Sequence, residues 1–191
     1  MRADDLYRLP EGLPVPDDDG ACRHLCGLAV PPIALAATDG TSIRLDEART
    51  RWTVVYAYPR TGVPDRDSPP GWDAIPGARG CTPHSCTFRD HHAELRALGA
   101  TVYGLSTQDT GYQREMAERL HLPFPVLSDA ALELTRAWNL PTFEFAGEVV
   151  LKRFSLILEA GRIAHVHYPV FPPTADAPAV LAWLRARGVS S

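Results

Sequence analysis

The chain has 191 residues, of which 45% are hydrophobic, and this is enough apolar material to fill the core of one domain of ordinary size. A formal net charge of -4 without any basic run argues against nucleic acid or an anionic membrane as the main partner, which leaves small molecules or proteins. The first residues lack the basic and apolar stretches of a secretory signal, so we expect a soluble, cytoplasmic protein whose cysteines are catalytic, metal-binding or inert rather than structural disulfides.

The amino-terminal part predicts an arm, a hairpin and a central strand. Proline and aspartate are frequent in residues 1–30, which we interpret as an extended arm lying over a domain at residues 31–188. Residues 33–36 and 42–45 flank a Thr-Asp-Gly turn and predict a hairpin. Residues 53–58 are β-forming without clear alternation, as expected of a central strand covered on both faces.

A long loop follows at residues 60–80, where prolines and glycines recur too often for regular structure. Loops of this length in compact domains are usually functional or disordered, and the sequence leaves open whether this one is a lid or an interface. Trp72 lies in it and would either cover a pocket or contact a second copy of the chain. We treat residues 60–80 as an insertion.

Helices and strands alternate through the rest of the chain. The pattern predicts, in order, a helix at 84–98, a strand at 101–106, a helix at 112–120, an extended segment at 125–127, a helix at 131–138, a hairpin at 153–158 and 162–167, and a closing helix at 178–187. Such alternation favours parallel βαβ units. The sequence therefore predicts a domain of the α/β class.

Two cysteines, Cys81 and Cys86, lie five residues apart where the long loop meets the next helix. Unpaired backbone N–H groups and the positive end of the helix dipole favour a thiolate there, so Cys81 is a candidate nucleophile. In an intact helix, Cα atoms of positions five apart are roughly 8.6 Å from each other. A disulfide usually needs about 7 Å or less. The two cysteines therefore cannot join unless the first turns of the helix unwind.

This constraint suggests a cycle with two states. In the folded state, a thiolate at Cys81 would attack a peroxide O–O bond and become a sulfenic acid, which condenses with a nearby thiol to a disulfide. In a locally unfolded state, Cys86 would capture the oxidised sulfur. A separate dithiol protein would then reduce the disulfide by exchange.

The segment Gly-Cys-Thr-x-x-x-Cys-x-Phe-Arg-Asp at residues 80–90 resembles the active-site segment of the Q-type (bacterioferritin-comigratory) peroxiredoxins. The order of elements from about residue 30 to residue 188 is also similar to that family's thioredoxin-like fold. The resemblance implies a thioredoxin-like α/β fold with a central mixed sheet flanked by helices. It also implies that Cys81 is the peroxidatic cysteine and Cys86 the resolving cysteine.

The same resemblance implies the activity and the partners. The protein would be a thiol-dependent peroxidase that reduces hydrogen peroxide and organic hydroperoxides, with no cofactor, as a monomer or homodimer. Thioredoxin or a similar dithiol reductant would recycle it. Arg-Phe-Ser at residues 153–155 resembles the Arg-x-Thr that opens a late strand of peroxiredoxins, so Arg153 would orient the peroxide and stabilise the thiolate.

The chain departs from the family pattern upstream of Cys81. The usual Pro-x-x-x-Thr-x-x-Cys would need Pro and Thr where Ala74 and Ala78 stand. Tyr-Pro-Arg-Thr at residues 58–61 instead resembles the beginning of that motif, followed by the insertion. By this resemblance Pro59 shields the site, and Thr61 is our first choice for the hydroxyl that binds the peroxide. The other candidate hydroxyls are those of Ser68 and Thr82.

Other reactive side chains lie outside these motifs. Cys22 and Cys26 have the i, i+4 spacing of one helical face and could be metal ligands or substitute resolving thiols, although we favour packed or spare cysteines. His84, His91 and His92 follow Cys81 on its helix and could tune it, but such spacing is more typical of a solvated face.

Two further functions stay open. A general thiol-disulfide oxidoreductase usually carries Cys-x-x-Cys, and the four-residue gap between Cys81 and Cys86 argues against that activity. A redox sensor, or an interaction module in which all four cysteines bind zinc, is the alternative from the binding class. Stoichiometric oxidation without turnover would distinguish the sensor from the peroxidase.

Overall fold

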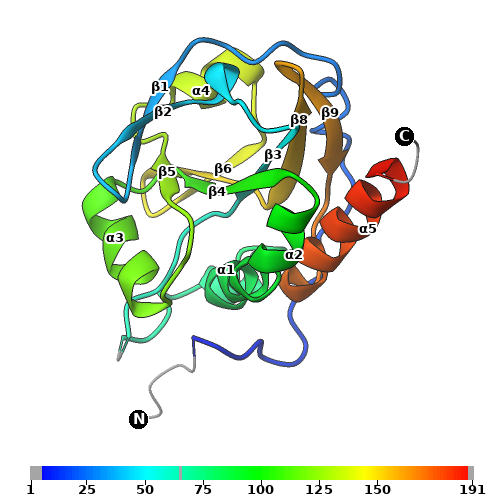
Figure 1. The fold of residues 1–191 in the computed structure, drawn as a ribbon. Helices are drawn as coiled ribbons and strands as arrows, with labels where there is room; N and C mark the ends of the chain where they lie inside the picture. Colours follow the sequence, from blue (N-terminus) through cyan, green and yellow to red (C-terminus); the bar gives the residue numbers. More distant parts are fainter. Residues whose placement is uncertain (1–5, 65, 189–191) are drawn as a thin grey trace.

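The structure is a computed structural model that describes residues 6–64 and 66–188. In this part of the chain, one seven-stranded mixed sheet has the order β2-β1-β5-β4-β3-β8-β9, and β6 pairs with β7 in a separate hairpin (Figure 1). The strands are β1 (Ala34–Ala37), β2 (Ser42–Arg44), β3 (Trp52–Ala57), β4 (Ala100–Ser106), β5 (Val126–Ser128), β6 (Thr142–Phe145), β7 (Glu148–Leu151), β8 (Phe154–Glu159) and β9 (Arg162–His167). The parallel strands β3, β4 and β5 form its centre.

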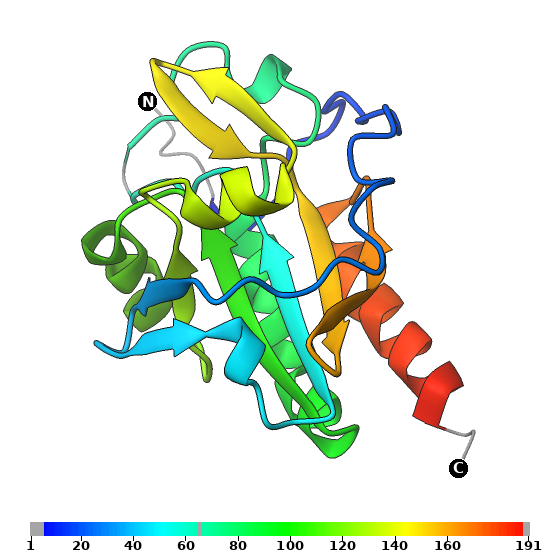
Figure 2. The same ribbon diagram turned by 90° about the horizontal axis from the view of Figure 1, so that it is seen from above.

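Helices cover both faces of this sheet. The helices are α1 (Cys81–Asp90), α2 (His92–Ala97), α3 (Thr110–Arg119), α4 (Glu133–Trp138) and α5 (Asp176–Gly188), with 3-10 turns η1 (Leu45–Glu47), η2 (Trp72–Ala74) and η3 (Pro173–Ala175). One core cluster joins α1, α2, α3 and α5 to the sheet, and a second joins α4 to its other face (Figures 1 and 2). The predicted α/β class, with a central mixed sheet flanked by helices, is confirmed.

Strand β3 is the centre of both core clusters. All six of its residues are buried. Val54 and Tyr56 pack in the cluster with α1 and α5, whereas Val55 and Ala57 pack in the cluster with α4, because successive side chains of a strand point to opposite faces. A strand buried on both faces needs no polar alternation, which explains its continuous run of β-forming residues.

Three predictions of local structure need correction. The helix predicted at residues 84–98 is two helices, and the first begins at Cys81 because Gly80 adopts φ of +100°, a turn that glycine makes without strain. The hairpin of β6 and β7 was not predicted, although Phe143 and Phe145 alternate before a turn at residues 146 and 147. The loop at residues 60–80 contains the 3-10 turn η2.

The loop at residues 60–80 packs against the β6–β7 hairpin, as Figure 2 shows. Trp72 is only 4% exposed, and its ring centroid lies 6.0 Å from that of Phe143 and 4.8 Å from that of Phe145. The unpredicted hairpin therefore provides the apolar surface that buries the tryptophan. Of the two roles considered for Trp72, the structure supports the first, because Trp72 also lines a pocket that contains Cys81.

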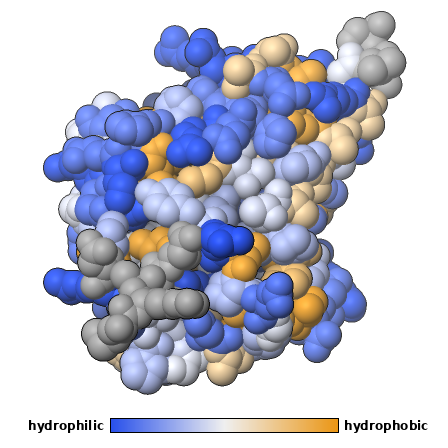
Figure 3. Space-filling model, turned by 90° about the horizontal axis from the view of Figure 1, so that it is seen from below, coloured by the Kyte–Doolittle hydropathy of each residue, from blue (hydrophilic) through white to orange (hydrophobic). Residues whose placement is uncertain are grey.

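The arm contributes to the core at its carboxyl-terminal end. Leu25 is fully buried in the cluster on the α4 side of the sheet, and Ala29 forms an antiparallel bridge with Arg162. Viewed from the side of α1, the surface is mostly hydrophilic with separate hydrophobic patches (Figure 3). Among the described helices, none is long and apolar enough to span a membrane.

Candidate active site

The sheet topology brings three distant segments to one end of β3. Strand β8 runs antiparallel to β3 with Ala57 opposite Phe154, so Arg153 lies beside the segment that leaves β3. That segment leads through the loop at residues 60–80 to Cys81, the first residue of α1. Parallel β4 ends at the same edge, and Gln108 follows it. Residues nearly 100 positions apart thus meet at the amino-terminal end of α1.

Arg153 is the direct charged partner of Cys81. The Arg153 Nη2 atom donates to Cys81 Sγ at 3.2 Å, and Cys81 Sγ lies 3.6 Å from the Ala78 carbonyl oxygen. Both side chains are buried, with 4% of Cys81 and 3% of Arg153 exposed. A guanidinium at this distance stabilises a sulfur anion more strongly than a neutral thiol, and burial strengthens the effect.

Backbone and side-chain acceptors hold the guanidinium in place. The Arg153 Nη2 atom also donates to the carbonyl oxygens of Ala78 and Arg79, each at 3.3 Å. The Arg153 Nη1 atom lies 2.7 Å from His84 Nδ1. The carbonyls belong to the loop just before α1, so the same backbone that introduces Cys81 also fixes the cation beside it.

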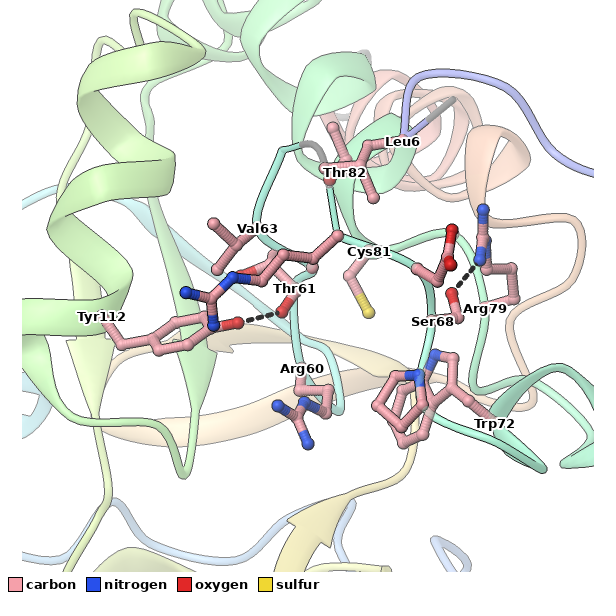
Figure 4. A pocket seen from close by; sticks show the side chains of 15 residues that line it. Leu6, Arg60, Thr61, Val63, Ser68, Trp72, Arg79, Cys81, Thr82 and Tyr112 are labelled. Carbon is pink, nitrogen blue, oxygen red and sulfur yellow. Dashed lines mark hydrogen bonds between the residues drawn. The ribbon is translucent and has the colours of Figure 1, made fainter. Parts of the chain in front are cut away.

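A pocket of about 240 Å³ opens over Cys81, whose sulfur points into it (Figure 4). Side chains from the arm, the insertion and α3 form its wall, and those labelled in Figure 4 are Leu6, Arg60, Thr61, Val63, Ser68, Trp72, Arg79, Cys81, Thr82 and Tyr112. The wall mixes apolar groups with guanidinium and hydroxyl groups. A small polar molecule can therefore reach the sulfur, although most of the cysteine is covered.

Thr61 lies in this wall and is held by polar contacts on two sides. Its backbone N–H donates to Gln108 Oε1 at 3.0 Å, and its hydroxyl donates to the same oxygen at 3.4 Å. The Tyr112 hydroxyl donates to the Thr61 carbonyl oxygen at 2.9 Å. Thr61 is 1% exposed, so its hydroxyl is fixed by the protein rather than by solvent.

The other candidate residues near Cys81 differ in their surroundings. Pro59 is buried two residues after the end of β3 but does not line the pocket. Ser68 and Thr82 do line it, and the Ser68 hydroxyl accepts a hydrogen bond from Arg79. The sequence alone did not identify Arg79, Gln108 or Tyr112, since no motif marks them.

All four cysteines are free thiols in different environments. Cys86 is half-buried on α1, and this burial raises the pKa of its thiol. Cys22 packs on the face of the sheet opposite to Cys81, and burial raises the pKa of Cys22 to about 12. Cys26 is exposed, and its Sγ lies 3.6 Å from the Ala164 carbonyl oxygen of β9. Within the described residues, no group of three or more His, Cys, Asp or Glu side chains is arranged so that it could hold a metal ion.

The interpretation of His84 as a solvated side chain was wrong. His84 is fully buried, whereas His91 and His92 are partly exposed. Its Nε2 atom lies 2.6 Å from Asp176 Oδ2, a contact that spans 92 positions. Helical spacing places all three histidines on one helix, but it does not reveal that α5 covers only the first of them.

Comparison with known proteins identifies the family of this chain. The Redoxin family model matches residues 25–182, and the chain therefore belongs to the redoxin family. Peroxiredoxin Q, a chloroplastic protein of Oryza sativa subsp. japonica, is 27% identical over 169 residues, which cover 86% of this chain and 70% of that protein. Peroxiredoxin bcp1 of Schizosaccharomyces pombe is 30% identical over 135 residues, covering 67% and 62% of the two chains.

Solved structures show the same likeness. Peroxidoxin BcpB of Mycobacterium tuberculosis has a TM-score of 0.68 and 26% identity, with 85% of this chain and 97% of that chain covered. Peroxiredoxin Q of Xanthomonas campestris has a TM-score of 0.64 and 25% identity, with 82% and 91% covered. Within the redoxin family, this protein is a peroxiredoxin of the Q-type subgroup, a thioredoxin-fold thiol-dependent peroxidase that acts on hydroperoxides with a thiol reductant.

Proposed function

We propose that Cys81 is the peroxidatic cysteine and that Arg153 stabilises its thiolate and orients the peroxide. The contact of 3.2 Å between Arg153 Nη2 and Cys81 Sγ, at the wall of an open pocket, is the observation that carries this proposal. The thiolate attacks one peroxide oxygen, so that an S–O bond forms and the O–O bond breaks. The other oxygen leaves with a proton as water or an alcohol, and Cys81 becomes a sulfenic acid.

Thr61 is the hydroxyl that we assign to the peroxide, with Pro59 behind it as a shield. The position of Thr61 in the pocket wall and the hydrogen bond from its hydroxyl to Gln108 support this assignment. Replacement by valine keeps the shape and removes the hydroxyl, so Thr61→Val should lower kcat/KM for hydrogen peroxide about tenfold or more. Its urea unfolding should stay near that of the wild type. The comparison variant is Thr82→Val, and a larger loss there would assign the hydroxyl to Thr82 instead.

Cys86 is the resolving cysteine of the proposed cycle. Its position in α1 keeps it from Cys81 until the first turns unwind, because positions five apart in a helix are too distant for a disulfide. Burial raises the pKa of Cys86 while α1 is folded, and unwinding removes that burial. The Cys86 thiol then condenses with the sulfenic acid, which forms the Cys81–Cys86 disulfide and releases water.

A dithiol protein such as thioredoxin completes the cycle by exchange, becoming a disulfide itself while both thiols are restored. The domain at residues 31–188, with residues 1–30 as its arm, belongs to the same proposal. We also propose that the protein is a monomer or a homodimer and that it is located in the cytoplasm. The relatives named as chloroplastic act in another compartment, so location is best tested on the protein itself.

One experiment tests the assignment of the two cysteines. Peroxide consumption is followed with a thioredoxin system for the wild type, Cys81→Ser, Cys86→Ser and, as a control, Cys26→Ser, which changes an exposed thiol of the amino-terminal arm. Cys81→Ser should lose turnover entirely, and Cys26→Ser should keep it. Insulin reduction without peroxide consumption would favour a general oxidoreductase, and stoichiometric oxidation without turnover would favour a sensor.

Mass spectrometry after one equivalent of peroxide tests the disulfide. The wild type should yield a peptide pair linked between Cys81 and Cys86, whereas Cys86→Ser should accumulate sulfenic or sulfinic acid at Cys81. A linked pair that joins Cys81 to Cys22 or Cys26 would replace Cys86 as the resolving cysteine. The absence of any oxidation at Cys81 would reject the peroxidatic role.

A further inference from the structure

A buried polar cluster lies behind Arg153, on the side away from the pocket. His84 on α1 and Asp176 at the start of α5 are both fully buried. The Asp176 carboxylate accepts from Ser155 Oγ at 2.6 Å, and its other oxygen lies 2.7 Å from His167 Nδ1. Four elements, α1, α5, β8 and β9, therefore meet at one carboxylate, which connects through His84 to the guanidinium beside Cys81.

The contacts of His84 determine its protonation state. A guanidinium only donates hydrogen bonds, so His84 Nδ1, at 2.7 Å from Arg153 Nη1, must be the acceptor and carries no proton. The proton of the neutral ring then lies on Nε2, which donates to Asp176 Oδ2 at 2.6 Å. Burial lowers the pKa of His84 to about 4, and Arg153 adds to this effect. The ring is a neutral link between a cation and an anion.

This link keeps the charge of Arg153 available to the sulfur. Burial by itself would raise the pKa of Asp176, but hydrogen bonds from His167 and His84 hold it below its ordinary value, so the carboxylate is ionised. Among the described residues, however, no carboxylate forms an ion pair with Arg153. Asp176 orients the imidazole, the imidazole orients the guanidinium, and no direct ion pair competes with a thiolate at Cys81.

We propose that His84, oriented by Asp176, is a positioning residue that holds Arg153 against Cys81 only while the first turns of α1 are wound. The inference rests on the proposed roles of Cys81, Cys86 and Arg153. The new element is that stabilisation of the thiolate depends on the folded state of α1. His84 and Asp176, which do not line the pocket, provide this dependence.

The position of His84 in α1 provides the coupling. It lies between Cys81 and Cys86, and its backbone N–H donates to the Gly80 carbonyl oxygen at 3.0 Å, within the turns that must open before the two sulfurs can meet. Opening those turns moves the imidazole away from Asp176 and Arg153. The motion that delivers Cys86 is therefore the same motion that releases the guanidinium from its support.

Two replacements separate the two hydrogen bonds of His84. Asparagine places an amide oxygen near the position of Nδ1, so His84→Asn retains an acceptor for Arg153 and loses the donor to Asp176. Glutamine places an amide nitrogen near the position of Nε2, so His84→Gln retains the donor to Asp176 and loses the acceptor. Both substitutions remove a buried ring, and their effects on folding should therefore be similar.

The readouts are the rate of the first reaction with hydrogen peroxide, Cys81 alkylation by iodoacetamide at pH 7, and urea unfolding. His84→Gln should lower the peroxide rate roughly 10- to 100-fold, as expected for a displaced active-site group, and His84→Asn should lower it less. Alkylation should follow the same order. Equal losses in both variants, or losses that track unfolding stability alone, would reduce His84 to a structural residue and overturn the inference.

The coupling has its own measurement. After oxidation of Cys81 by one equivalent of peroxide, formation of the disulfide is timed by acid quenching and mass spectrometry. It should proceed at least as fast in His84→Gln as in the wild type, because a restraint on unwinding is gone. Slower formation would contradict the coupling. If wild-type Cys81 does not react with peroxide at all, the proposed function fails, whereas a reactive wild type with unaffected His84 variants would remove only this inference.

Discussion

Burial of His84 makes the stability of the folded chain depend on pH. The pKa of His84 is lowered from 6.5 to about 4, first by burial and then by the charge of Arg153, although Asp176 works in the opposite direction. The other titratable groups that face the ring are His167, through Asp176, and Tyr56, whose ring centroid is 5.0 Å away. Between these two pKa values, His84 is therefore protonated in the unfolded chain and neutral in the folded chain.

The size of the effect follows from linkage. Where the unfolded state binds more protons, the free energy of unfolding falls as the pH falls, by about 1.4 kcal/mol per pH unit for one proton. For the two pKa values of His84, this gives a loss of about 2 kcal/mol between pH 7 and pH 5 and about 3 kcal/mol by pH 4. The stability is thus present above the unfolded pKa and declines as the pH approaches the folded one.

Urea unfolding of the reduced protein at pH 7, 6 and 5 measures this loss. His84→Gln removes the titrating ring, so its loss between pH 7 and pH 5 should be smaller than that of the wild type by about 2 kcal/mol. The matched control is His91→Gln, which changes a partly exposed histidine at the turn between α1 and α2 and should behave like the wild type. Parallel curves for wild type and His84→Gln would refute the reasoning.

Two further predictions concern packing. Leu25→Ala should lower the free energy of unfolding, measured with urea, by about 2 to 5 kcal/mol, because Leu25 is fully buried. Leu28 is 37% exposed, so Leu28→Ala should lower it by less than about 1 kcal/mol. Gly147→Ala should cost about 1 kcal/mol for its left-handed backbone alone. Gly80→Ala should cost more and slow alkylation of Cys81, since its Cβ would lie 2.5 Å from Leu9 Cδ2 and 2.8 Å from Pro173 Cγ. Equal costs at the two glycines would contradict this.

Local sequence patterns predicted most elements of the fold. The first hairpin, the central strand and the late hairpin follow from runs of β-forming residues between turn residues, and these interactions are local. The β6–β7 hairpin was missed because its strands are short, and the packing of its aromatic residues on Trp72, far earlier in the chain, is a contact that only the tertiary structure shows. The start of α1 at Cys81 also escaped the apolar pattern, since the φ of Gly80 decides it.

For the active site, too, local sequence features indicated one part, and only the tertiary structure showed the other. The spacing of Cys81 and Cys86 and the family-like segment around them indicated thiol chemistry from the sequence alone, because a thiol at a helix start and the reach of a helical turn are local properties. Only the tertiary structure decided that Arg153, His84 and Asp176 form one buried chain of contacts behind the sulfur. Antiparallel pairing of β8 with β3 and the packing of α5 on α1 create that chain, and no spacing in the sequence encodes contacts between residues 69 to 92 positions apart.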